Sequence, residues 1–236
     1  MTRMGIPESK KSIFLRSVFE LNKNNCHFDY LAAKKDAGDG FMEYTEQINI
    51  ELASIHYDFL TDFGKKELTF MLAYIHQMME AKRVSNLGPL ASILMIYISP
   101  EEVFKILKLL VERSDKIKMR DNLMHLRNKL GWHVATDEDD HARLISTFID
   151  SYISLKKNGN RRQVLVKFYE LQYNFDFFVH QMMNSLLTVV IPIDFAIPVI
   201  FNYLIEGQKG IFKSMYGLIK SNKQFIVSLS SKDQLM

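Results

Sequence analysis

Helix-breaking residues are scarce in this sequence, and their scarcity constrains the fold more than any single motif does. The 236 residues include 10 glycines and 5 prolines, which leaves long stretches without a break. Leu68, Met71, Leu72, Ile75 and Met79 recur at the three-and-four spacing of one helix face. Since few breakers favour long helices over many short strands, the sequence predicts an all-α fold.

No feature of the sequence divides the chain. It contains no internal repeat, no low-complexity tract and no linker rich in Gly, Ser and Pro. We therefore predict a single helical domain over residues 1–225 and a polar tail over 226–236. Asn24 and Asn25 are predicted to stop the first helix, and residues 34–40 are predicted to form a polar loop. The helices that the pattern predicts span residues 7–21, 65–83, 90–98, 100–112, 136–155, 192–206 and 210–222.

Cysteine content and hydropathy indicate the cellular compartment in which the protein is expected. A single cysteine, Cys26, cannot form an intramolecular disulfide, so we expect a reducing compartment. The N-terminal residues lack the apolar core of a signal peptide. Residues 186–205 are nearly all apolar, but Asp194, Asn202 and two prolines interrupt them, so we predict a break at Ile191 and no transmembrane span. A cytoplasmic protein is expected, including one in a cytoskeletal or membrane-associated assembly.

The charge pattern argues against general affinity for nucleic acid. The formal net charge is +3, and both signs are spread along the chain. Local basic runs occur at residues 113–120 and 156–162, which is typical of a solvated surface. We therefore predict no nucleic-acid partner.

Motifs of familiar enzyme classes are absent. The sequence has no P-loop, no GxGxxG and no GxSxG. A polar cluster from His133 to His141 contains metal-ligand residue types, but it lacks a known ligand spacing, and acids in the first turn of a helix are explained by the helix dipole. Cys26 would need a base partner to act as a nucleophile, and its neighbour His27 points elsewhere in a regular element. We expect no metal and no cofactor.

Several short motifs follow one another along nearly the whole chain. They are Gly5-Ile6-Pro7, Leu68-x-x-x-Leu72-Ala73-Tyr74, Leu186-Leu187-x(4)-Pro192, Glu206-Gly207 and Ile211-Phe212. In order and spacing they resemble the TBC domain of Rab GTPase-activating proteins. The resemblance implies a multi-helix, all-α domain that acts on GTP hydrolysis by small GTPases of the Rab type.

The resemblance does not extend to the two catalytic residues of that family. A TBC domain uses an arginine from an Ile-x-x-Asp-x-x-Arg motif and a glutamine from a Tyr-x-Gln-Gly motif. In the corresponding segment 48–54, Ser54 stands at the arginine position, and in segment 83–86, Ser85 stands at the glutamine position. An alternative register, Tyr74-Ile75-His76-Gln77, also lacks glutamine at the third place of that motif. Since an arginine finger contributes about three to five orders of magnitude in turnover, normal catalysis is not expected.

We therefore predict a catalytically inactive TBC-like domain, not an enzyme, that serves as a protein-binding or structural subunit of an intracellular assembly. Its partners would be a Rab-type small GTPase or subunits of a larger complex. Two alternatives stay open: an active GTPase-activating protein that uses Arg83 or Gln77 as a substitute finger, and an unrelated helical adaptor. One aromatic and Met-rich set would form either the core or a docking surface: Phe175, Phe177, Phe178, Met182 and Met183.

Overall fold

The computed structural model describes residues 6–37, 48, 59–79, 87–120, 138–154 and 159–231, with the backbone alone for 113–120, 138–141, 154 and 159–162. Every regular element in these residues is a helix, which confirms the predicted all-α fold. The elements are η1 (Glu8–Lys10), α1 (Lys11–Val18), α2 (Lys23–Ala37), α4 (Asp62–Met78), α5 (Leu87–Leu94), α6 (Pro100–Arg120), α7 (Glu138–Ser154), α8 (Gly159–Glu170), α9 (Phe175–Asn184), α10 (Ile193–Glu206), α11 (Gln208–Ser221) and α12 (Lys223–Ser228).

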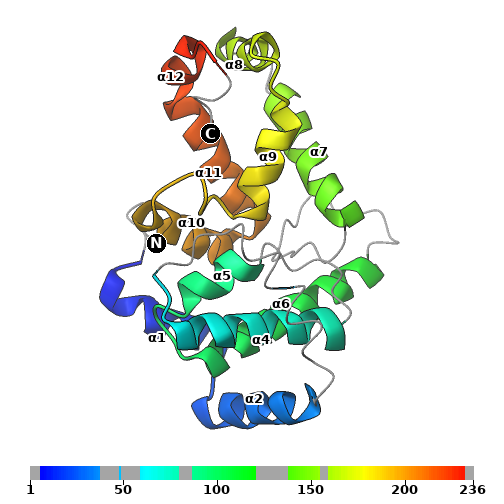
Figure 1. Cartoon of the computed structure of the whole chain (residues 1–236), viewed down its shortest axis with the longest axis vertical. Coiled ribbons are helices and arrows are strands. Elements are labelled where there is room, and N and C mark those ends of the chain that lie inside the picture. The colour runs from blue at the N-terminus through cyan, green and yellow to red at the C-terminus, as the bar shows by residue number, and fades with distance from the viewer. Residues whose placement is uncertain are drawn as a thin grey trace.

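The molecule is elongated, and its helices form two groups along the long axis (Figure 1). We call residues 6–120, with α1 to α6, the N-terminal half, and residues 138–231, with α7 to α12, the C-terminal half. Helix α10 lies where the two halves meet and packs against both α5 and α11. Helix α2 covers one end of the molecule, and α8 with α12 covers the other (Figure 1).

The core of the N-terminal half is built around α5, all of whose residues are buried. Helix α4 turns Leu68, Met71, Leu72 and Ile75 inward, as their spacing predicts. Helix α6 begins at Pro100, the predicted first position, where a missing N–H costs nothing. It then extends beyond the predicted end near residue 112 to Arg120, so the structure adds two turns to that prediction.

Helix α2 overturns the prediction for residues 24–37, and residues 38–40 of the predicted loop lie outside the described residues. Asn24 and Asn25 do not stop a helix but begin one, because the side-chain oxygen of Asn22 accepts hydrogen bonds from both of their backbone N–H groups, at 3.1 and 3.4 Å. The predicted polar loop at 34–40 is helical as far as Ala37. The helix continues because it packs along α6 and buries one side, which compensates for the polar residues on the other.

The core of the C-terminal half is largely aromatic. The ring of Phe168 lies 5.1 Å from the rings of both Phe175 and Phe178, measured between centroids. Phe148 stacks with Tyr152 at 6.1 Å. The contacts of Phe168 join α8 to α9, and the ring of Tyr152, 5.4 Å from that of Phe175, joins α7 to α9. Such ring contacts add to the stabilisation from burial alone.

The apolar segment 186–205 is divided as predicted. The chain breaks at Ile191 and Pro192, and α10 begins at Ile193. No helix in the described part of the chain is both long and apolar enough to cross a membrane. Gly210 allows α11 to approach α10 closely, because a Cβ at this position would lie 2.7 Å from the carbonyl oxygen of Asn202.

The C-terminal helix α12 lies where the sequence suggested polar tail. Ile226 within it and Leu229 just after it are buried, so the boundary expected at residue 225 falls inside a packed helix. Helix α12 packs against α8 and α11. Residues 223–229 thus belong to the packed C-terminal half.

Candidate functional site

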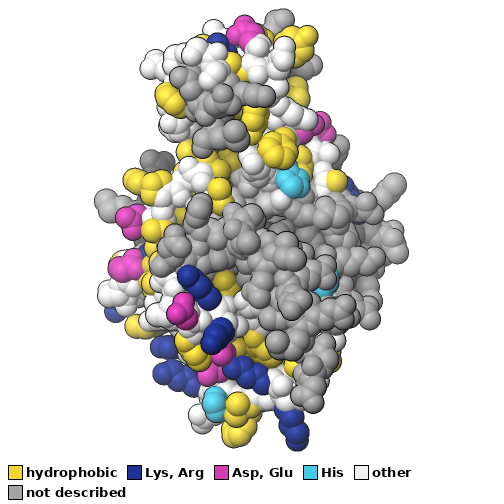
Figure 2. Space-filling view, in the orientation of Figure 1, with side chains coloured by type: hydrophobic (Ala, Val, Ile, Leu, Met, Phe, Trp, Pro, Cys, Tyr) yellow, Lys and Arg dark blue, Asp and Glu magenta, His cyan; other side chains and the backbone are white. Residues whose placement is uncertain are grey.

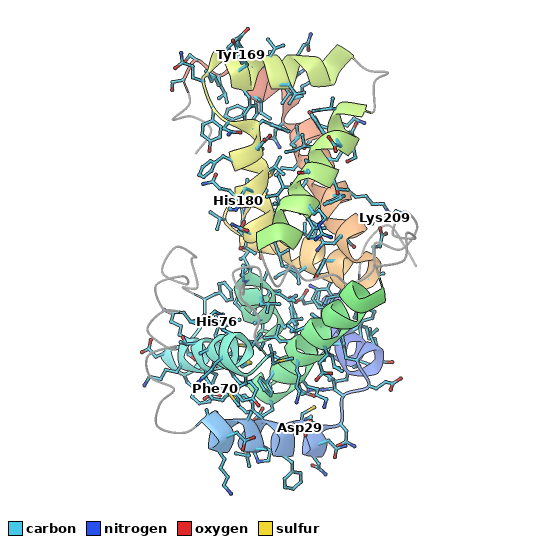
Figure 3. All side chains as sticks on the ribbon, turned by 90° about the vertical axis from the view of Figure 1, so that its right-hand side faces the viewer. Asp29, Phe70, His76, Tyr169, His180 and Lys209 are labelled. Atoms are coloured by element: carbon cyan, nitrogen blue, oxygen red, sulfur yellow. The ribbon has the colours of Figure 1, made fainter. Side chains whose placement is uncertain are left out.

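Of the four site residues that the TBC resemblance suggests, only Gln77 is among the described residues. Ser54, Arg83 and Ser85 lie outside the described residues. Gln77 lies in the last turn of α4, next to His76, which Figure 3 labels. Its side-chain oxygen is buried and accepts no hydrogen bond from a described residue. The residue as a whole is partly exposed, so the burial concerns this oxygen.

The side chains of the polar cluster from His133 to His141 also lie outside the described part of the protein. His133 to Asp137 are not among the described residues, and the side chains of 138–141 are not described. Among the described side chains, no three His, Cys, Asp or Glu residues gather closely enough to hold a metal ion.

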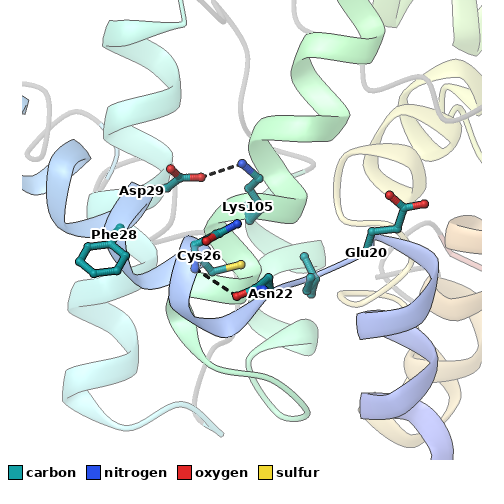
Figure 4. A pocket seen from close by; sticks show the side chains of 8 residues that line it. Glu20, Asn22, Cys26, Phe28, Asp29 and Lys105 are labelled. Carbon is teal, nitrogen blue, oxygen red and sulfur yellow. Dashed lines mark hydrogen bonds and ion pairs between the residues drawn. The ribbon is translucent and has the colours of Figure 1, made fainter.

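Cys26 lies on the buried side of α2, facing α6 (Figure 4). Burial raises the pKa of its thiol, and the nearby carboxylate of Glu102 raises it further. The imidazole Nδ1 of His27 lies 3.7 Å from a carboxylate oxygen of Glu101, so it is engaged with α6. Because a nucleophilic cysteine must be a thiolate, this environment is that of an inert thiol.

A hollow of about 380 Å³ opens beside Cys26, between the α1–α2 connection, α2 and α6 (Figure 4). Within it, Lys105 Nζ lies 2.7 Å from Asp29 Oδ2, and this hydrogen bond raises the pKa of the lysine. The charges of this pair compensate each other, and Glu20 adds a further carboxylate to the lining. Its lining residues are Glu20, Leu21, Asn22, Asn25, Cys26, Phe28, Asp29 and Lys105.

The buried carboxylate of Glu102 links α1 to the start of α6 through hydrogen bonds. Its carboxylate is 1% exposed and accepts hydrogen bonds from Arg16 Nε at 2.7 Å and from an Arg16 Nη at 3.1 Å. It also accepts one from the backbone N–H of Ser99 at 3.1 Å, as in a capping box. Burial alone would raise the pKa of Glu102, but these bonds outweigh it and lower the pKa.

Glu67 fastens α2 to α4. Its carboxylate accepts a hydrogen bond from the phenol of Tyr30 at 2.5 Å and two from Lys34 Nζ, both at 2.9 Å. The ammonium of Lys34 also lies 4.7 Å from the centre of the Tyr30 ring. Burial and the adjacent Glu67 raise the pKa of Tyr30 far above its ordinary value, so it stays a phenol and a donor.

These bonds fix one side of α2 and leave the opposite side to solvent. Phe28 is 70% exposed and Leu31 is 49% exposed, and Asn24, Ala32 and Lys35 beside them are exposed as well. We call these five residues the α2 outer face. Figure 4 shows Phe28 pointing away from the Asp29–Lys105 pair, and Figure 2 shows hydrophobic side chains among lysines and arginines at this end of the molecule.

The aromatic and Met-rich set on α9 belongs to the core and not to a docking surface. Phe175, Met182 and Met183 are buried and Phe178 is partly buried, because they form the side of α9 that packs against α7 and α8. Phe177 alone of this set is half-exposed, and its ring contacts Tyr173 at 6.2 Å.

The α2 outer face was not expected from the sequence, although a signal was present. Helix α2 carries apolar residues on two sides: Cys26, Tyr30 and Ala33 on one, Phe28 and Leu31 on the other. A surface helix needs only one apolar side to pack, so a second one is the mark of a contact surface.

In the comparisons with known proteins, neither a family model nor a curated protein matches this chain.

Proposed function

We propose that this chain is a catalytically inactive, TBC-like helical module that binds other proteins. Its binding surface in this proposal is the α2 outer face together with the polar hollow beside it. The module works as a subunit of an intracellular assembly, with a Rab-type small GTPase or another subunit as the partner. It supplies no residue to the chemistry of GTP hydrolysis.

The positions of the TBC-like motifs in the fold are compatible with this proposal. Pro7 directly precedes the first helical turn, and Pro192 directly precedes α10. Glu206 and Gly207 join α10 to α11, where Gly207 has a φ of 65° that favours glycine. These three motifs therefore lie at the ends of helices, where short sequence signals carry structural meaning. The motifs at 68–74 and 211–212 lie inside α4 and α11.

The described ionisable side chains support a non-catalytic module. Arg16 holds a buried carboxylate, and Lys34 holds another. A finger residue must instead extend from the surface to stabilise charge on a partner's phosphate. Gln77, one of the two substitutes considered, has its side-chain oxygen buried. A working finger at this position would require the side chain to turn outward.

The exposed aromatic and aliphatic side chains of α2 carry the proposal. Phe28 and Leu31 lie one turn apart on a helix that Glu67 holds in place from the other side. Rigid, exposed apolar residues bordered by polar ones are typical of protein-binding surfaces. The compartment we propose is the cytoplasm, in a cytoskeletal or membrane-associated assembly, and the buried free thiol of Cys26 is compatible with it.

Single-turnover GTP hydrolysis by a panel of purified Rab-type GTPases, with and without the protein, tests the absence of catalysis. We expect no acceleration, whereas intact fingers would give about a thousandfold or more. An acceleration of about a hundredfold that is lost in Arg83→Ala or Gln77→Ala would instead establish a working GTPase-activating protein with a substitute finger.

A pull-down of the same GTPases, loaded with GTP, tests binding at the α2 outer face. A retained GTPase should be lost with Phe28→Ser and kept with Phe177→Ser, which removes a half-exposed phenylalanine elsewhere. Equal retention by both variants would contradict the assignment of the surface to α2.

A further inference from the structure

Helix α1 is followed by a glutamate in a backbone conformation that favours glycine. Glu20 has a φ of 51°. Its backbone N–H donates to the carbonyl oxygen of Ser17, and the N–H of Leu21 donates to that of Arg16 at 2.9 Å. Helices that end with these bonds usually have glycine at this position, because a Cβ is strained there. Strained residues cluster at functional sites, which directs attention to the side chain of Glu20.

The carboxylate of Glu20 is exposed and lines the hollow beside α2. Among the described residues, no side chain forms an ion pair or a hydrogen bond with it. Of the described residues that line the hollow, one is a cation, Lys105, and Asp29 already holds it at 2.7 Å. Lys23 at the start of α2 is exposed and does not line the hollow. The lining therefore has one carboxylate in excess.

The hollow is continuous with the α2 outer face, because Phe28 belongs to both. Figure 4 shows Phe28 on one side of the hollow and Glu20 on the other. A partner that contacts Phe28 and Leu31 therefore needs a long cationic side chain to reach Glu20 across the hollow. Arginine fits best, because its forked N–H donors bond both oxygens of a carboxylate and its charge is weakly hydrated. Asn25 in the lining offers the same group a further carbonyl oxygen.

We propose that an arginine of the protein partner enters the hollow beside α2 and pairs with Glu20, while apolar residues next to it contact Phe28 and Leu31. This inference deepens the proposed function and rests on the α2 outer face as the binding surface. The unpaired carboxylate then makes the site selective, since a partner with an acidic residue at this place would be repelled.

Two short peptides test the proposal on the full chain. One is acetyl-Leu-Leu-Arg-Leu-amide, and the other has citrulline in place of arginine, which keeps the shape without the charge. Binding is followed through the backbone amide NMR signals of the protein. We expect the arginine peptide to shift signals within residues 20–31 and to bind about fivefold more tightly than the citrulline peptide, as for one partly exposed ion pair. Equal affinities, or shifts confined to other residues, would overturn the proposal.

A charge-removing variant assigns the preference to one carboxylate. In Glu20→Gln the two peptides should bind equally, which completes a double-mutant cycle with the arginine-to-citrulline change. Asp62→Asn is the matched control, because Asp62 is an exposed acid at the start of α4 that does not line the hollow. It should keep the fivefold preference. If Asp62→Asn removes the preference as fully as Glu20→Gln, the attraction is general and the assignment to Glu20 is wrong.

A pair of glycine substitutions separates recognition from a structural role of the glutamate. Glu20→Gly removes the carboxylate and the strained Cβ, so the preference for arginine should disappear while the midpoint of thermal unfolding rises by about 2–4 °C. Gln172→Gly is the matched variant, since Gln172 has a φ of 52° after α8 and does not line the hollow. It should raise the midpoint similarly and keep the preference. A lower midpoint for Glu20→Gly would show that the glutamate stabilises the turn, and would overturn its role in recognition.

The outcomes separate this inference from the proposed function. If both peptides shift the signals of Phe28 and Leu31 equally, the α2 outer face binds apolar residues without an arginine, and this inference alone fails. If N-acetylarginine methylamide binds as tightly as the arginine peptide, the hollow takes a small cation, which also overturns the inference. If neither peptide shifts a signal within residues 20–31, the inference fails, and the GTPase pull-down still decides the proposed function.

Discussion

The two halves of the molecule differ in where their carboxylates lie, although the cores of both contain aromatic contacts. In the N-terminal half, buried carboxylates of Glu67 and Glu102 join neighbouring helices through charged hydrogen bonds. In the C-terminal half, rings such as Phe168 join them, and the described ion pairs, Lys213–Glu206 among them, are at the surface. Salt bridges depend on protonation and aromatic packing depends on volume, so the two halves should respond to different perturbations.

The largest effect is expected from removing an aromatic ring in the C-terminal half. Phe168→Ala should lower the free energy of unfolding by about 4 kcal/mol, because the ring is buried among Phe175, Phe178 and Tyr173 and leaves a cavity. Urea denaturation measures this. Its neighbour Tyr169 is exposed, and Tyr169→Ala should change stability by less than about 0.5 kcal/mol. Similar losses for both variants would contradict the aromatic core.

Removing a buried carboxylate in the N-terminal half should come next. Glu102→Ala should cost about 3 kcal/mol in unfolding free energy, since Arg16 and the N–H of Ser99 lose their acceptor. Glu101→Ala, one residue earlier, removes a partly exposed carboxylate and should cost less than about 1 kcal/mol. A cost for Glu102→Ala as small as that of Glu101→Ala would show that the bonds from Arg16 add little.

A smaller effect is expected from removing the single hydroxyl of Tyr30. Tyr30→Phe removes the phenol that donates to Glu67 and should lower the unfolding free energy by about 1.5 kcal/mol, as for a hydrogen bond to a charged group. Tyr169→Phe removes an exposed hydroxyl and should have no measurable effect. If both variants unfold at the same denaturant concentration as the unmodified protein, Lys34 alone satisfies the carboxylate.

The smallest effect is a pH dependence confined to the N-terminal half. The pKa of Glu102 is lowered from 4.5 in the folded protein, so its contribution is present above that value and is lost as the pH falls through the lower, folded pKa. The unmodified protein should therefore lose more stability than Glu102→Gln between about pH 5 and pH 3. Parallel losses in thermal unfolding across this range would contradict the assignment.

The fold was predictable where periodicity was strong and single-sided. Leu68, Leu72 and Ile75 placed α4, and Pro100 and Pro192 placed the starts of α6 and α10 within a residue. Helix α2 was not predicted, because its apolar residues lie on two sides and its asparagines suggested a stop. Only the tertiary contact with α6 shows which side is buried, and local propensity does not contain that information.

The candidate site was less predictable than the fold. The exposure of Phe28 and Tyr169 depends on which faces of α2 and α8 meet their neighbours, and identical residues at Phe168 and Phe175 are buried. The pairing of Arg16 with Glu102 joins positions far apart in the chain, and no local pattern indicates it. Prolines predicted helix starts well, because Pro suits the first helical turn, whereas the predicted stop at Asn24 and Asn25 and the predicted end of α6 were wrong.

The contacts of Lys11 have a consequence for biosynthesis. Its ammonium hydrogen-bonds to Glu8 and lies 5.0 Å from the centre of the Tyr97 ring and 5.4 Å from that of Phe201. During translation, Phe201 is added roughly 190 residues after Lys11. At about 5–20 residues per second, α1 leaves the ribosome on the order of 10–40 s before its final binding site exists. Helix α1 can thus reach Tyr97 and Glu102 early, but its contact with α10 forms only after Phe201 is made.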